Sequence, residues 1–81
     1  MEFGKRIREL RKERKETQLQ VAEAIGTTMR HYQRFELNEA LPGLEFFYAL
    51  SEHFQVNADY LLCRTDVRDM LPPSARREET V

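Results

Sequence analysis

The sequence contains few of the residues that build disulfide frameworks, tight backbone turns or membrane spans. Its 81 residues include one cysteine, no tryptophan, three glycines and three prolines. Because Cys63 has no partner for a disulfide within the chain, a reducing compartment is natural for it. The longest apolar run, residues 46–50, is far shorter than the ~20 residues that a helix needs to cross a bilayer. We therefore predict a cytoplasmic protein with no membrane partner.

Motifs of catalysis and of metal binding are also missing from the sequence. There is no glycine-rich phosphate-binding loop, and the residues His31, His53 and Cys63 stand singly and far apart. This spacing indicates neither a zinc site nor a Cys/His nucleophile, and His53 is expected on the solvent-facing side of its helix. The carboxylates each have a basic neighbour or belong to a solvated face. We predict a protein that is not an enzyme and uses no metal, cofactor or small-molecule ligand.

The charge of the chain is nearly balanced in sum but uneven along its length. Charged residues make up 33% of the sequence, and the net charge is −1. Residues 1–17 carry seven Lys or Arg and four Glu, whereas residues 38–63 carry four acids and no Lys or Arg. A balanced total argues against non-specific coating of nucleic acid, and a monomer is expected to bind DNA weakly at physiological salt. A chain of this length is expected to form one domain with a modest core.

Hydrophobic spacing predicts an all-α protein. An apolar stripe at i, i+4 and i+7 indicates a helix over residues 2–15, and four further helices are expected over residues 17–26, 28–37, 44–54 and 58–63. The stripe of the first helix consists of Phe3, Ile7 and Leu10. The inward face of the fourth helix is expected to consist of Leu44, Phe47, Leu50 and Phe54. Five short helices that share one core are near the limit for this length.

Polar and small residues at the expected helix ends support these boundaries. Thr17 and Gln20 have the spacing of a capping box, in which each side chain satisfies a backbone N–H at the start of a helix. Gly26 tolerates the left-handed conformation that ends that helix. Thr27 or Thr28 is then expected to cap the third helix, since a hydroxyl can accept from the first unpaired N–H groups. The second and third helices are thus separated by a tight turn.

The second and third helices have the features of a DNA-reading pair. Two helices that cross closely need a small residue at the contact, which Ala22 supplies, and Gly26 permits the turn. Tyr32 and Phe35, three residues apart, form the inner apolar face of the third helix. The other residues of this helix are Thr28, Met29, Arg30, His31, Gln33 and Arg34. Such a polar face is suited to a DNA major groove.

The spacing of these residues resembles that of the phage-repressor/Cro-like (XRE) helix-turn-helix family. The first, fifth, ninth, fifteenth and eighteenth places of the motif are held by Gln18, Ala22, Gly26, Tyr32 and Phe35. The order of the family is also followed, over residues 3–62, by Leu10-Arg11, Glu36, Pro42 and residues 56–62. The resemblance implies a compact five-helix, lambda-repressor-like DNA-binding domain with the helix-turn-helix at the second and third helices.

The resemblance also implies roles for individual residues. His31 is expected to be exposed and, like Gln18, to contact a DNA phosphate. The N–H groups of the helix start would help Gln18 in this contact, although Gln18 could instead simply begin its helix. Arg11 and Glu36 are expected to form a partly buried ion pair that joins the first and third helices. The residues expected to read bases are Thr28, Met29, Arg30, Gln33 and Arg34. Arginine can bind guanine, glutamine can bind adenine, and methionine can pack on a thymine methyl group. Which of these residues contact bases and which contact phosphates stays open from the sequence.

One segment departs from the family pattern. After the third helix the family often has glycine and basic residues that clamp the DNA backbone, whereas residues 37–41 read Leu-Asn-Glu-Ala-Leu. Asn38 takes the usual glycine position and can adopt the same left-handed conformation. Glu39 brings an acid where a base is expected. The phosphate clamp is therefore expected to be weak, while the fold is unaffected.

We predict a sequence-specific transcriptional regulator, a repressor of a bacterium or its phage, that occludes polymerase at a double-stranded DNA operator. The helix-turn-helix domain is expected to span residues 1–65, followed by a flexible charged tail at 66–81. A homodimer is expected because one small reading unit has too little interface for strong specificity. Phe46 and Leu62, which lie outside the inward stripes, are expected to be exposed and to form its seam.

A function of another class remains open from the sequence. The acidic fourth and fifth helices and the tail could bind a protein, as in an antitoxin or an anti-repressor partner. The observations that favour this alternative are the four acids without a base over residues 38–63 and the acidic loop after the third helix.

Overall fold

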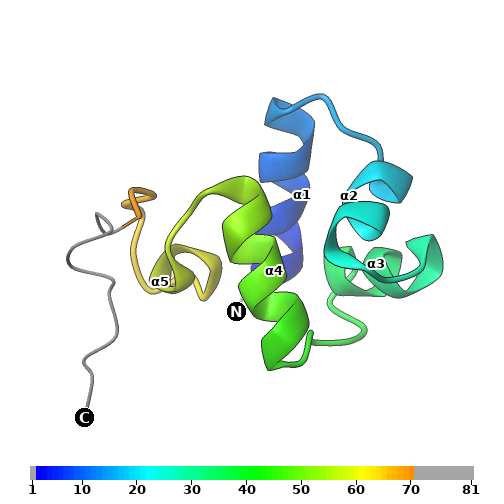
Figure 1. Cartoon of the computed structure of the whole chain (residues 1–81). Helices are drawn as coiled ribbons and strands as arrows, with labels where there is room; N and C mark the ends of the chain where they lie inside the picture. The colour runs from blue at the N-terminus through cyan, green and yellow to red at the C-terminus, as the bar shows by residue number, and fades with distance from the viewer. Residues whose placement is uncertain (1, 71–81) are drawn as a thin grey trace, which may run out of the picture.

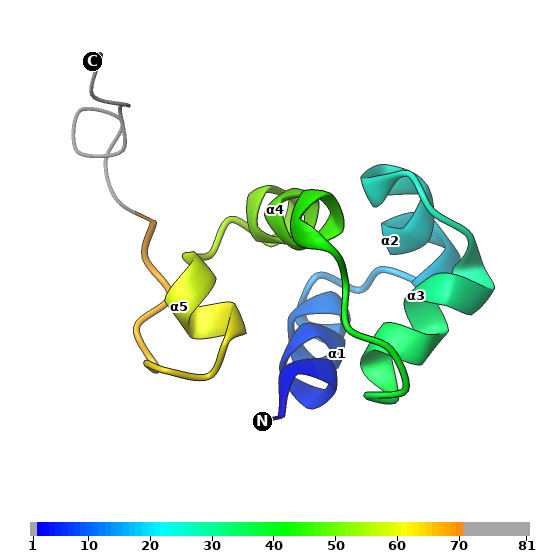
Figure 2. The same ribbon diagram turned by 90° about the horizontal axis from the view of Figure 1, so that it is seen from below.

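The computed structural model describes residues 2–70, which form five α-helices and no strand. The helices are α1 (Phe3–Glu13), α2 (Gln18–Ile25), α3 (Met29–Glu36), α4 (Leu44–Phe54) and α5 (Ala58–Leu61). In Figures 1 and 2, α1 and α4 lie in the middle, with α2 and α3 on one side and α5 on the other. The predicted all-α, five-helix architecture is confirmed. None of these helices is long and apolar enough to cross a membrane.

All five helices contribute to one hydrophobic core. Its buried residues are Phe3, Ile7, Leu10, Val21, Ala22, Ile25, Tyr32, Phe35, Leu50, Phe54, Val56, Tyr60 and Leu61. The predicted inward face of α4 is only partly correct, because Leu44 is 83% exposed and Phe47 is only partly buried. Periodicity predicts which side of a helix is apolar, but the neighbouring helices leave the first residue of that side of α4, Leu44, open to solvent.

The helix ends follow the predicted local chemistry. The Thr17 hydroxyl accepts from the Gln20 backbone N–H at 3.1 Å, and the Gln20 side chain accepts from the Thr17 N–H at 2.8 Å, which completes the capping box. Thr28, rather than Thr27, caps α3 by accepting from the His31 N–H. Gly26 ends α2 in the left-handed region at φ 85°. The turn between α2 and α3 is therefore set by residues within it.

A close approach of two backbones brings α1 against the end of α3. A Cβ atom on Gly4 would lie 2.3 Å from the carbonyl oxygen of Glu36, so only glycine fits there. Asn38, in the left-handed region at φ 59°, uses its side-chain oxygen to accept from the Gly4 N–H at 3.0 Å. Asn38, two residues past the end of α3, thus also satisfies a donor in the first turn of α1. The sequence alone predicts the conformation of Asn38 but not this contact.

His53 links α4 to the connection between α1 and α2. Its Nε2 lies 2.9 Å from the Glu16 carboxylate, and its side chain is only 17% exposed. The prediction of a solvent-facing His53 is therefore wrong. The α1–α2 connection passes over this part of α4, where Glu16 also accepts from Arg14.

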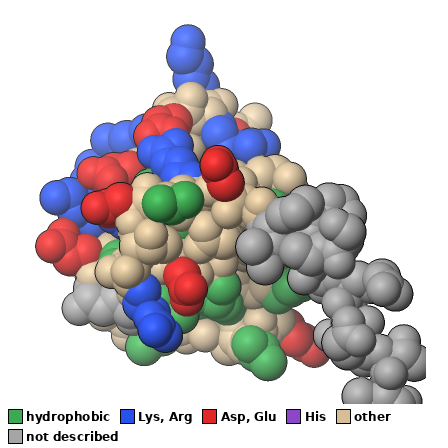
Figure 3. Space-filling view, turned by 90° about the vertical axis from the view of Figure 1, so that its left-hand side faces the viewer, with side chains coloured by type: hydrophobic (Ala, Val, Ile, Leu, Met, Phe, Trp, Pro, Cys, Tyr) green, Lys and Arg blue, Asp and Glu red, His purple; other side chains and the backbone are tan. Residues whose placement is uncertain are grey.

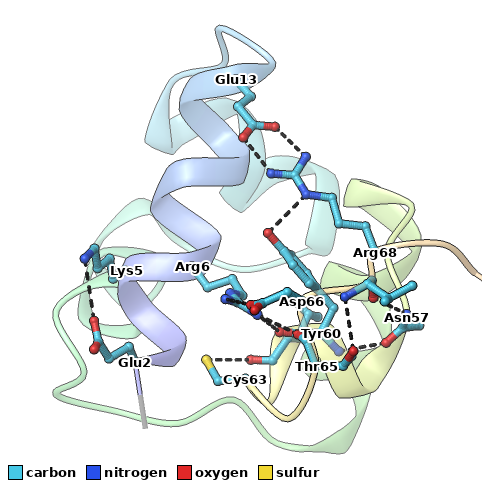
Figure 4. Close-up of polar contacts among 12 residues, drawn as sticks. Glu2, Lys5, Arg6, Glu13, Asn57, Tyr60, Cys63, Thr65, Asp66 and Arg68 are labelled. Carbon is cyan, nitrogen blue, oxygen red and sulfur yellow. Dashed lines mark hydrogen bonds and ion pairs between the residues drawn. The ribbon is translucent and has the colours of Figure 1, made fainter.

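The segment after α5 packs against α1 (Figure 4). Arg6 donates to the backbone carbonyls of Tyr60 and Thr65 at 3.0 and 2.9 Å and forms an ion pair with Asp66 at 3.0 Å. Its guanidinium also lies 4.1 Å from the centre of the Tyr60 ring, within the range of a cation–π contact. One arginine of α1 therefore holds both α5 and the residues that follow it.

A second set of contacts extends this packing to Asp69. Arg68 donates through both terminal nitrogens to Glu13, each at 2.7 Å, and Asn57 donates to the carbonyls of Val67 and Asp69. The contacts thus continue past the domain boundary that the sequence predicts after residue 65. Residues 71–81 of the predicted tail lie outside the described residues.

Candidate nucleic-acid interface

The outer face of α3 presents the side chains that the sequence assigns to base reading. Thr28, Met29, Arg30 and Arg34 are exposed, Met29 by 43%, while Gln33 is half-buried. The opposite face of α3 carries Tyr32 and Phe35, which are fully buried. Burial of the aromatic face against α1 and α2 therefore turns the polar face outward. The geometry brings the five predicted base-reading residues onto one helix, with four of them open to solvent.

The expected ion pair of Arg11 and Glu36 is present and joins α1 to α3. Arg11 donates through Nε at 2.6 Å and through a terminal nitrogen at 3.1 Å to the two oxygens of the Glu36 carboxylate. The two side chains are only 12% and 3% exposed. A bidentate pair of this kind is directional, and removing one partner would strand a charge in a poorly solvated place.

The ion pair continues into a chain of hydrogen bonds that reaches the outer face of α3. Gln18 donates to the Glu36 carboxylate at 3.1 Å, and Gln33 donates to the side-chain oxygen of Gln18 at 3.0 Å. Each bond restricts the rotation of the next side chain. Gln33 is therefore oriented before any ligand arrives and keeps its own oxygen and one N–H for a further contact.

The surroundings of Glu36 keep its carboxylate charged. Burial alone would raise the pKa of Glu36, but hydrogen bonds from Arg11 and Gln18 outweigh burial and hold the pKa below its ordinary value. The hydrogen bond to Glu36 in turn raises the pKa of Arg11. The chain of bonds from Arg11 to Gln33 is thus anchored on a carboxylate that is ionised at neutral pH.

His31 is less exposed than the sequence predicts. Its ring is half-buried, with the ring centre 4.5 Å from that of Phe35 and 5.5 Å from that of Phe46. Its Nδ1 lies 2.8 Å from the Thr27 hydroxyl. The expectation of an exposed His31 is therefore wrong, because Phe46 of α4 packs against one side of its ring. A contact from His31 to a phosphate would have to use Nε2.

The two residues predicted to form a dimer seam have different environments. Phe46 is partly buried against the core and contacts His31 and Phe35, so the expectation that it is exposed is wrong. Leu62 is likewise half-buried, so the expectation that it is exposed is also wrong, and it lines an apolar groove of about 330 Å³. The residues of this apolar groove are Phe3, Leu41, Pro42, Leu44, Phe47 and Leu62. In Figure 3 most of the hydrophobic side chains lie on the lower part of the molecule, with a few charged ones among them, and most of the charged side chains lie on the upper part.

Sequence reasoning missed Arg8, which borders the face formed by α2 and α3. Arg8 lines a polar notch together with Gln18, Gln33, Glu36 and Leu37. It is exposed and makes no hydrogen bond or ion pair within residues 2–70. The signal that could have found it is its position three residues before Arg11, which places both arginines on neighbouring parts of α1. The notch therefore places a cation, unpaired within the described residues, beside the two hydrogen-bonded glutamines Gln18 and Gln33.

The acidic loop after α3 contacts the outer face of α3. The carboxylate of Glu39 lies 3.9 Å from Nε of Arg34. The backbone N–H of Glu39 also donates to the Arg34 carbonyl at 2.9 Å. Arg34 therefore has an acidic neighbour, whereas Arg30 forms no ion pair within the described part of the chain.

Comparison with known proteins agrees with this geometry. Residues 4–67 match the helix-turn-helix domain family. The chain is 37% identical over 67 residues to the uncharacterised HTH-type transcriptional regulator YobD of Bacillus subtilis. That match covers 83% of this chain and 60% of YobD, so the chain spans less than two thirds of its relative's length.

Solved structures of the P22 c2 repressor resemble the fold. Its complex with a synthetic operator has a TM-score of 0.73 and 33% identity over 75% of this chain and 92% of the other. The solution structure of its DNA-binding domain has a TM-score of 0.72 and 34% identity over 76% and 82% of the two chains. The chain therefore belongs to the helix-turn-helix family and is one of its phage-repressor-like (XRE) members.

Proposed function

We propose that this chain is a sequence-specific, DNA-binding transcriptional regulator that places α3 in the major groove of an operator. The observation that carries the proposal is the outer face of α3, where exposed Arg30 and Arg34 flank a glutamine that is already oriented. The similarity to a repressor solved in complex with a synthetic operator supports operator DNA as the partner. As a repressor, the protein would act by occluding polymerase, and it would do so in the cytoplasm without catalysis.

The side chains divide between base reading and backbone contact. Arg30 and Arg34 can each grip the O6 and N7 atoms of a guanine, and Gln33 can use its remaining oxygen and N–H on an adenine. Thr28 and Met29 stand beside them at the start of α3. Gln18 and Arg8 border this face from α2 and α1, and we assign them to phosphates. His31 joins this group through its Nε2.

The regulator would act as a homodimer with its seam at the apolar groove. Leu44 and Leu41 are 83% and 66% exposed at this groove, and Leu62 lies in it. Exposed leucines that gather at a concave apolar surface are typical of a contact with another protein surface. A two-fold dimer implies a pseudo-palindromic operator with half-sites about one helical turn, ~34 Å, apart.

Selection of bound sequences from a random DNA library tests the proposal. We expect the selection to enrich one motif. The logarithm of the association constant for that motif should then fall linearly and steeply with the logarithm of the salt concentration. Failure to enrich any motif over several rounds would refute the proposal. The family match favours DNA as the partner. If the selection fails, however, the acidic residues of the second half of the chain would make a protein-binding module the better interpretation.

A further inference from the structure

The loop that follows α3 has one charged residue, and that residue faces an arginine of the proposed reading surface. Among residues 37–43, Glu39 alone is charged. Its carboxylate lies 3.9 Å from Nε of Arg34, and the side chains of Arg34 and Glu39 are 52% and 58% exposed. The backbone of Glu39 is tied to the same residue, since its N–H donates to the Arg34 carbonyl. The backbone therefore keeps Glu39 beside Arg34, while the two side chains themselves are open to solvent.

We propose that Glu39 is a specificity-determining residue that weakens binding to DNA of arbitrary sequence more than it weakens binding to the operator. This inference rests on the proposed function. Attraction between cations and phosphates supplies almost all of non-specific binding. Glu39 reduces that attraction in two ways, because it offsets the charge of Arg34 and places its own negative charge beside the end of α3.

Base reading by Arg34 is less affected than its attraction to phosphates. The contact with Glu39 is made through Nε, so the two terminal nitrogens remain for a bidentate grip on guanine. A hydrogen-bonded guanine edge is selected by geometry as well as by charge, whereas a phosphate attracts a cation without regard to sequence. An exposed pair at this distance is weak, so Glu39 moderates binding without preventing it.

The experiment compares the parent with Glu39→Gln on two duplexes of equal length, the operator obtained by selection and a mixed-sequence duplex. Asp59→Asn is the matched control, because it removes one negative charge at an exposed residue of α5. Figures 1 and 2 show α5 on the other side of α1 and α4 from α3. Dissociation constants are measured by fluorescence anisotropy over a series of salt concentrations.

We expect Glu39→Gln to bind the mixed-sequence duplex about three- to tenfold more tightly, with a log–log salt slope steeper by about 1. The gain on the operator should be smaller, so the ratio of the two affinities falls. Asp59→Asn should change both constants less than about twofold. When Arg34 is already replaced by alanine, Glu39→Gln should raise the affinity for the mixed-sequence duplex by a smaller factor, because the arginine whose charge Glu39 offsets is gone.

Two results would overturn this role for Glu39 while leaving the proposed function in place. In the first, the parent binds its operator, but Glu39→Gln raises the affinity for the mixed-sequence duplex no more than Asp59→Asn does. The other is an equal gain on both duplexes, which would make Glu39 a general electrostatic contribution without selectivity. If the parent enriches no operator at all, the proposed function fails and the role of Glu39 fails with it.

Discussion

Glu36 is a charged residue in the core region, and its contacts explain how three helices keep their relative positions. Its carboxylate accepts from Arg11 of α1 and from Gln18 of α2, while its own backbone belongs to α3. Apolar packing alone tolerates small rotations of one helix on another, whereas a bidentate ion pair has a narrow range of geometries. The orientation of the reading helix thus depends on polar contacts as well as on the core.

Replacing Glu36 by glutamine should destabilise the protein by about 3 kcal/mol, because Arg11 is left as an uncompensated charge in a poorly solvated site. Glu9→Gln is the control, since Glu9 is exposed and forms no ion pair within residues 2–70. Glu13 is unsuitable, because it binds Arg68. Chemical denaturation measures the free energy of unfolding of both variants. Equal decreases in this free energy would show that the Arg11–Glu36 pair is effectively solvated.

The depressed pKa of Glu36 predicts a pH dependence of stability. A carboxylate whose folded-state pKa lies below the ordinary value of 4.5 contributes its full stabilisation above that pH and loses it as the pH falls through the lower folded-state value. The stability difference between the parent and Glu36→Gln should therefore be constant near neutral pH and shrink below about pH 4. Melting temperatures of both proteins from pH 7 to pH 3 give this difference. A difference that stays constant over the whole range would contradict a lowered pKa for Glu36.

At the same scale, Arg30→Ala and Arg34→Ala should weaken operator binding and leave the fold intact. Both side chains are exposed on α3, so their loss removes contacts with DNA without removing core packing. A bidentate base contact is worth about 1–3 kcal/mol, and its loss should relax preference at one base position. Binding titrations together with circular dichroism test this prediction, which two variants with parental affinity would refute.

At the scale of helices, the contact between α1 and the end of α3 has no room for a side chain at Gly4. Gly4→Ala should cost about 1–3 kcal/mol or more, since its Cβ would meet the backbone oxygen of Glu36, which cannot move aside as a side chain can. Gly43→Ala is a matched control, because nothing lies within 4 Å of a Cβ there. Denaturation midpoints compare the two, and equal values would show that α1 shifts without cost.

The short helix α5 depends on the segment that follows it. Its four residues, Ala58–Leu61, are too few to be stable as an isolated helix. Asn57 caps its start and also donates to the carbonyls of Val67 and Asp69, while Arg68 donates to the hydroxyl of Tyr60. The residues that the sequence assigns to a tail therefore support the last helix of the domain.

At the scale of the whole molecule, the proposed dimer makes the apolar groove the surface to test. Leu44→Glu should reduce cooperative binding to the full operator while sparing the fold, because Leu44 is 83% exposed. Tyr48→Glu, on the same helix but outside the groove lining, is the control. Phe46→Glu is not a clean test, since Phe46 packs against His31.

Sedimentation with an operator duplex measures the number of protomers bound. Two protomers for the parent and for Tyr48→Glu, with cooperativity lost in Leu44→Glu, is the expected pattern. A single protomer per full site at saturation, or an unaffected Leu44→Glu variant, would remove this groove from consideration as the seam.

Features that depend on residues close in sequence could be predicted from the sequence alone. The capping box of Thr17 and Gln20, the left-handed Gly26 and the burial of Tyr32 and Phe35 follow from interactions within one or two helical turns. The same local pattern predicted that the polar face of α3 points outward. The helix-turn-helix and the outward position of four of its five candidate base-reading residues could therefore be predicted from local sequence.

What covers each helix face was decided only by the tertiary structure. His31 and Phe46 are brought together from α3 and α4, Gly4 meets the end of α3, and Arg68 reaches Glu13 across 55 positions in the chain. Hydrophobic periodicity predicts which side of a helix is apolar but not which neighbour lies there or where its cover ends. Such contacts depend on how separate helices pack in three dimensions, and residues far apart in sequence carry no local signal of their meeting.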